Sequence, residues 1–143
     1  MGQVFGGVMS LLQKISVGYF VVLLAAAALN YVPGITDDQG LAFGVFALDL
    51  FDDTLHLASA LWALIAAFMG ARASKVFLVA FGALYLGDGL LGFVTGWGYL
   101  DFGIFTNTSD GISFTVFRVL ANLPHIALGG VALFVGLRFG RVQ

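Results

Sequence analysis

Cysteine and glutamate are absent from this 143-residue chain, and charge of either sign is scarce. Without cysteine the protein has no disulfides, no thiolate metal sites and no thiol catalysis. Only 10% of the residues are charged, and the formal net charge is −2. A soluble domain of this size needs far more charge to cover its surface, so the composition points to an integral membrane protein.

Two classes of function lack the residues they require. The sequence has no basic run of the kind that binds nucleic acid electrostatically. It also has no nucleophile elbow, phosphate loop or zincin motif, and no serine or threonine has a base at motif spacing. We therefore predict a protein that is not an enzyme and has no nucleic-acid partner.

Long apolar sequence is what the chain has in abundance, with 60% hydrophobic residues and a mean hydropathy of +1.02. Four apolar segments cover residues 15–32, 54–71, 76–97 and 119–137. Each is near the ~20 residues that a helix needs to cross a bilayer, where backbone groups must bond within the segment. The predicted fold is an all-α bundle of four transmembrane helices, in a single domain over residues 1–143.

The charged residues divide between the two ends of these segments. Five of the six basic residues fall on one side: Lys14, Arg72, Lys75, Arg138 and Arg141. Seven aspartates fall on the other: Asp37, Asp38, Asp49, Asp52, Asp53, Asp101 and Asp110. The positive-inside rule then predicts a multi-pass protein of the cell inner membrane with both termini in the cytoplasm. Arg118 is the exception to this distribution.

The chain also repeats itself weakly. "LAFGVF" (41–46) is similar to "LDFGIF" (100–105), and residues 55–72 are similar to residues 124–141. We interpret this as two pseudo-repeated helical hairpins in the same orientation, related by an axis along the membrane normal.

Five polar residues inside or at the mouth of the apolar segments are the candidate site. His56 and His125 occupy matching places in the two halves, and Asp53 and Asn122 each precede their histidine by three positions. That spacing places each pair on one helix face. Asp88, within "YLGDGLLG", lies in the same half of the membrane. The sequence therefore predicts a polar pocket formed by all five residues.

The histidines have both ligand-binding and structural interpretations. Two imidazoles on parallel helices at one depth can ligate a b-type haem from opposite faces, and one alone can ligate a pigment magnesium. A metal ion held by both histidines and Asp53 or Asp88 is a further alternative. In the structural interpretation, His56 and His125 bond to water, backbone or a loop aspartate, and Asp53 is the N-cap of the second helix.

Asp88 is the strongest single anomaly, because a charged residue inside a span is costly. It is either a proton or cation site, or a structural residue bonded to Tyr85, Thr95 or a histidine on a neighbouring helix. The flanking Gly87 and Gly89 let other chain segments approach closely. Small residues in 87–92 and 127–136 predict closely packed helix faces, within the chain or with a partner.

Several motifs resemble a family of small bacterial four-span membrane proteins that is catalogued only as a domain of unknown function. They are "NYVPGIT" after the first span, the [D/N]-x-x-H-L entry to the second, "FGALYLGDGLLGFVTG" in the third and the N-x-x-H of the fourth. The similarity covers most of residues 15–140, with an apparent insertion in 106–125. It implies a four-helix protein of the bacterial inner membrane and no particular activity.

Three functions follow as hypotheses. The first is a non-enzymatic packing or accessory subunit of a larger inner-membrane complex, in contact with lipid and with other subunits or copies of itself. The second is a carrier of haem b, a pigment or a metal, ligated by His56 and His125. The third is a small proton- or ion-coupled transporter that uses Asp88 and the histidines.

Overall fold

Four long helices dominate the computed structural model, which describes residues 8–141. They are α1 (Leu11–Ala28, continued by the 3₁₀ turn η1, Leu29–Tyr31), α2 (Leu50–Met69), α3 (Ala71–Thr95) and α5 (Val116–Phe139). All four are long and apolar enough to cross a membrane, which confirms the prediction of four long apolar helices. Large apolar side chains such as Val21, Ile65 and Phe134 are exposed along them, as expected for helices that face lipid.

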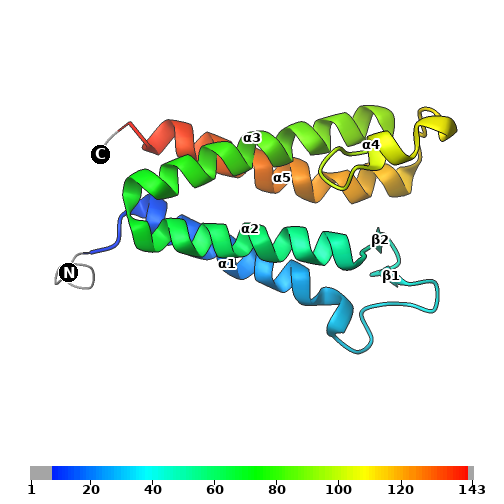
Figure 1. Cartoon of the computed structure of the whole chain (residues 1–143), viewed down its shortest axis with the longest axis horizontal. Coiled ribbons are helices and arrows are strands. Elements are labelled where there is room, and N and C mark those ends of the chain that lie inside the picture. Colours follow the sequence, from blue (N-terminus) through cyan, green and yellow to red (C-terminus); the bar gives the residue numbers. More distant parts are fainter. Residues whose placement is uncertain (1–7, 142–143) are drawn as a thin grey trace.

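Shorter elements lie in the two loops. A two-stranded antiparallel pair, β1 (Leu41–Ala42) and β2 (Phe46–Ala47), follows α1. The short helix α4 (Gly103–Thr106) and the turn η2 (Thr108–Asp110) follow α3. Both loops lie at one end of the molecule, which we term the loop end (Figure 1). The α2–α3 turn and the two ends of the described chain lie at the opposite, termini end.

The second helix begins four residues before the predicted start at 54. Asp49 is its N-cap: the carboxylate accepts hydrogen bonds from the backbone N–H groups of Phe51 (2.8 Å) and Asp52 (2.9 Å). The side chain of Asp52 in turn accepts from the backbone N–H of Asp49, which completes a capping box. The prediction that Asp53 caps this helix is therefore wrong, because Asp53 already lies inside the first turn.

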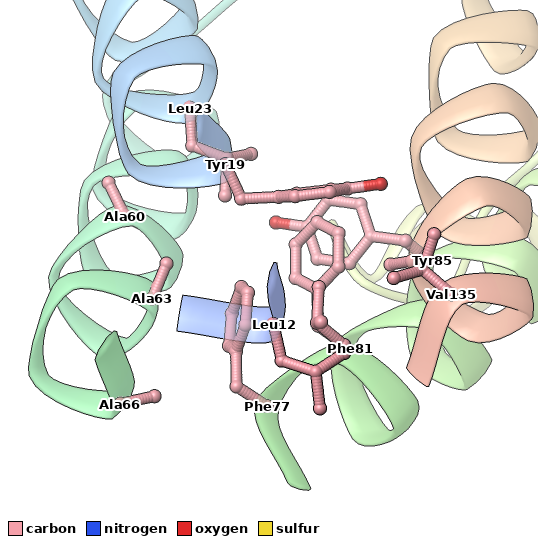
Figure 2. Packing of buried hydrophobic residues seen from close by; sticks show 12 residues of the cluster. Leu12, Tyr19, Leu23, Ala60, Ala63, Ala66, Phe77, Phe81, Tyr85 and Val135 are labelled. Carbon is pink, nitrogen blue, oxygen red and sulfur yellow. The ribbon is translucent and has the colours of Figure 1, made fainter. Parts of the chain in front are cut away.

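The helices form two antiparallel pairs, α1 with α2 and α3 with α5, which diverge toward the loop end (Figure 1). A single residue, Gly70, joins α2 to α3 with a φ of +112°, which side chains rarely allow. Near the termini end the pairs meet through rings of α3, where Phe77, Phe81 and Tyr85 recur every four residues. Figure 2 shows these rings between the helices, with Tyr19 of α1 lying edge-on to Phe81 at 5.4 Å.

Glycines allow α3 and α5 to pack with their backbones in contact. A Cβ added at Gly89 would lie 2.8 Å from the backbone nitrogen of Ile126. Gly82 of α3 meets the backbone of Leu133 in the same way, and Gly129 of α5 meets that of Leu86. The small residues predicted as packing faces thus serve an interface within the chain. Such close approach is what small residues provide between membrane helices.

Equivalent phenylalanines of the two F-G-x-F segments share a rare backbone conformation. Phe43 has a φ of +55° and Phe102 a φ of +60°, and these are the two non-glycine residues with positive φ in residues 8–141. Bulky side chains rarely adopt this region. The shared conformation supports the repeat proposed from the sequence, which remains a prediction.

Replacing Gly129 with alanine is expected to lower stability, because the new Cβ meets the backbone of Leu86 and the helices must separate. Overpacking of this kind costs about 1–3 kcal/mol. Gly18→Ala on α1 is the matched control, since nothing lies within 4 Å of its added Cβ. Thermal unfolding in detergent measures both. Equal melting temperatures for the two variants would contradict the close α3–α5 packing.

Candidate functional site

A cavity of about 540 Å³ lies at the loop end between the two helix pairs. Its volume is in the range of pockets that bind small molecules. Apolar residues of α1, the β2 segment and α5 make up much of its wall. Its charged and strongly polar lining residues are Asp52, His56, Asp88, Asp101, Arg118, Asn122 and His125.

Asp88 is the centre of the polar network and is almost completely buried. Its Oδ2 lies 2.6 Å from Nδ1 of His125, and its Oδ1 accepts hydrogen bonds from the backbone N–H groups of Tyr99 (2.6 Å) and Leu100 (2.7 Å). When Asp88 is ionised it can only accept, so Nδ1 of His125 is then the donor in this pair. Of the partners that the sequence allowed for Asp88, the neighbouring histidine is the one found. This carboxylate therefore ties α3 both to α5 and to the following loop.

The loop after α3 folds back closely over Asp88. A Cβ at Gly98 would lie 2.6 Å from Asp88 Oδ1, so only glycine fits there without a shift. Tyr99 runs back along α3, lies against Gly87 and donates its hydroxyl proton to the carbonyl of Leu84. Burial and the charge of Asp88 raise the pKa of Tyr99, which keeps the hydroxyl protonated as a donor.

The two histidines lie close together and edge-on at the wall of the cavity. Their ring centroids are 6.2 Å apart, and Tyr85 lies beside both rings. Nδ1 of His56 is buried without a hydrogen-bond partner. Within residues 8–141, no protein group bonds to Nε2 of either histidine. The site therefore presents two imidazole nitrogens that the protein itself does not satisfy.

Asp53 does not belong to this pocket. It is buried on the side of α2 that faces α1, where it accepts hydrogen bonds from Nδ2 of Asn30 at 3.2 and 3.3 Å. Asp52 lines the cavity instead, one helical turn before His56. Residues three and four positions before a histidine are both its neighbours on a helix, so spacing could not choose between them. The hydrogen bonds from Asn30 hold Asp53 toward α1, so Asp52 is the aspartate that lines the cavity.

Asn122 lines the cavity as predicted, but its amide is already engaged. Nδ2 donates to the carbonyl of Arg118 (2.7 Å), and the side chain fills the space above Gly92 of α3. It is a packing residue of the α3–α5 interface at the edge of the site.

Sequence reasoning missed Arg118 and Trp97 as members of the site. The guanidinium carbon of Arg118 lies 3.4 Å from the centroid of the Trp97 ring, and both residues line the cavity. The Trp97 indole N–H donates to the carbonyl of Gly111, which fixes the ring. The available signal was charge: Arg118 was the basic residue that the predicted topology left unexplained.

The described residues offer few protein ligands to a bare metal ion. Across residues 8–141, no group of three or more histidine, cysteine, aspartate or glutamate side chains is close enough to hold one. The alternative of an ion bound by both histidines and Asp53 or Asp88 is therefore not supported. Two imidazoles suffice only where another group supplies the remaining ligands.

Below the histidines the molecule is filled by aromatic side chains. The hydroxyls of Tyr85 and Ser59 are 3.0 Å apart, and Phe81 stacks on Tyr85 with centroids 4.0 Å apart. Phe81 and Tyr85 belong to the buried cluster shown in Figure 2, which also includes Phe77 and Leu12. The cavity is accordingly confined to the loop-end half of the bundle.

Comparison of the chain with family models, with curated proteins and with solved structures finds no match in any of the three.

The substitution Asp88→Asn is expected to loosen the loop over the site. An asparagine side chain is uncharged and has a single acceptor oxygen, so it cannot accept hydrogen bonds both from His125 and from the loop amides as the two carboxylate oxygens do. Weakening a buried network of this kind costs about 1–3 kcal/mol. We expect a lower melting temperature and faster hydrogen exchange at the Tyr99 and Leu100 amides. Asp38→Asn, at an exposed loop position, is the control. Unchanged exchange in Asp88→Asn would show that the carboxylate does not hold the loop.

Proposed function

We propose that this integral membrane protein holds a histidine-ligated cofactor in its loop-end cavity, with His56 and His125 as the residues that would ligate its metal and haem as the cofactor that fits best. One observation carries the proposal: the two imidazole rings, whose Nε2 atoms bond to no protein group within residues 8–141, have centroids 6.2 Å apart, and Nδ1 of His125 is held by a buried carboxylate.

The ring separation agrees with ligation of one shared ion. Imidazole nitrogens lie about 2.0–2.1 Å from a bound metal, so rings that approach from opposite sides have centroids about 6 Å apart. The observed centroid separation of 6.2 Å is compatible with this spacing.

The hydrogen bond from His125 to Asp88 has a defined chemical consequence. Nδ1 is held as the protonated nitrogen, so Nε2 keeps the lone pair that binds a metal. Carboxylate partners of this kind orient ligating histidines and raise their basicity.

The number of protein ligands favours a macrocycle over a bare ion. A porphyrin supplies four nitrogens and needs only two axial ligands from the protein. The cavity is large enough for an organic ligand and is lined largely by apolar and aromatic side chains, as such sites are.

The other two hypotheses receive less support. Transport needs a path across the membrane, and the aromatic cluster fills the bundle between the histidines and the termini end. The accessory-subunit hypothesis rests on the short chain, its small soluble surface, its small-residue helix faces and its lack of a catalytic motif. Several of those small residues pack within the chain, and lipid covers the exposed apolar faces as well as a partner subunit does. Unlike the cofactor proposal, the accessory-subunit hypothesis predicts a purified protein that is colourless and accompanied by other chains.

The test is titration of the purified protein with ferric haem, followed by visible spectroscopy in the oxidised and reduced states. We expect a low-spin spectrum with two histidine ligands, which His56→Ala and His125→Ala each abolish. Leu57→Ala and Leu123→Ala are matched controls, since these exposed residues lie beside or near the histidines on the same helices.

Two results would overturn the proposal. One is a wild-type spectrum identical to that of haem free in detergent. The other is haem binding that both histidine variants retain. A colourless protein that is extracted together with other membrane chains would support the accessory role instead.

A further inference from the structure

Arg118 occupies a position that electrostatics of the fold disfavours. It is the one basic residue of the loop end, and it lies in the first turn of α5. The N-terminus of a helix carries partial positive charge and prefers anions, so a cation there is unfavourable. An anionic partner would offset this cost.

The described protein supplies no such partner. Within residues 8–141 the single close pair of opposite charges is His125 with Asp88, so no carboxylate lies within ion-pair distance of Arg118. Its guanidinium has one long contact, 3.5 Å from Nη1 to the carbonyl oxygen of Gly96, and its central carbon lies over the Trp97 ring, 3.4 Å from the ring centroid. The side chain is half-buried at the wall of the cavity.

The carboxylates that line the same cavity already have donors. Asp88 accepts from His125 and the loop, Asp101 from the backbone N–H of Gly103 (2.8 Å), and Asp52 from that of Asp49 (3.4 Å). The cavity thus combines engaged acidic groups with one unpaired, stacked arginine. Stacking on Trp97 leaves the N–H groups at the edge of the guanidinium available. This edge can form a bidentate pair of hydrogen bonds with a carboxylate.

We infer that Arg118 recognises a carboxylate of the ligand in the loop-end cavity, and that the ligand is therefore an apolar molecule with an acidic group at one edge. The inference rests on the proposed function and names the chemical class of its ligand. Haem, with its two propionates, is one member of this class, and a long-chain fatty acid is another.

The placement of Arg118 suits such a ligand. Arg118, Asn122 and His125 recur at intervals of four and three along α5, which puts them on one face of the helix. The rise between Arg118 and His125 is about 10 Å, at ~1.5 Å per residue. An apolar body can therefore lie near the histidines while its acidic edge reaches Arg118 at the membrane surface.

The test compares ferric haem with its dimethyl ester, which keeps the iron and the ring but has no carboxylates. We expect the wild-type protein to bind the acid at least about tenfold more tightly than the ester, the value of one charged hydrogen-bonded pair. Arg118→Gln should abolish this preference by weakening only the acid, and Arg118→Lys should restore part of it. Arg138→Gln is the control, because Arg138 lies over Phe139 at the other end of the same helix.

The outcomes separate this inference from the proposed function. Equal binding of acid and ester by the wild type, or an unchanged preference in Arg118→Gln, overturns the role of Arg118 and leaves histidine ligation standing. If neither form of haem binds, histidine ligation of haem is wrong. The same variants are then titrated with fluorescent cis-parinaric acid and its methyl ester, where an Arg118-dependent preference for the acid supports the inference.

Arg118 also has a competing partner in the phosphate groups of the bilayer. If Arg118→Gln changes the retention of anionic lipid but leaves the preference for acid over ester intact with both probes, the arginine binds lipid headgroups and the inference is wrong.

Discussion

The buried carboxylate of Asp88 is the constraint on which the loop-end half of this structure depends. An ionised group inside an apolar helix is tolerated only with hydrogen-bond donors around it. The donors come from His125 of α5 and from the backbone of Tyr99 and Leu100. To deliver them, α5 must approach α3 closely and the loop must turn back sharply. The glycines of the α3–α5 interface and Gly98 of the loop make both approaches possible.

The two halves of the bundle have different structural roles. Near the termini end, aromatic rings of α3 fill the space between the helix pairs and hold them together. Toward the loop end the pairs diverge (Figure 1), and the cavity lies there, where apolar packing gives way to polar groups. A rigid half thus positions the helices whose ends carry the candidate ligands. Sites supported by packed helices hold their geometry better than sites built on loops.

Particular residues show how far the sequence alone reaches. Helix length and composition predicted the four spans, because a bilayer imposes both on any chain that crosses it. Matching positions in two similar hairpins predicted that His56 lies near His125. The location of Asp88 inside an apolar span identified it as a candidate site residue. Asp53 was misassigned, because Asp49 and Asp52 begin the helix earlier and Asn30 draws Asp53 toward α1. Arg118 was visible only as an exception, since its relation to Trp97 and the cavity depends on the course of the loop.

Composition and periodicity by themselves determined the class of protein, the number of its helices and the depth at which its few polar residues lie. These follow from the solvent, because lipid admits few charges and requires each helix to satisfy its own backbone. Only the tertiary structure decided which carboxylate meets which histidine, which glycine meets which backbone, and where a cavity remains. Those outcomes depend on contacts between segments distant in sequence, such as Asp88 with His125 and Asn30 with Asp53. Local sequence spacing does not predict such contacts.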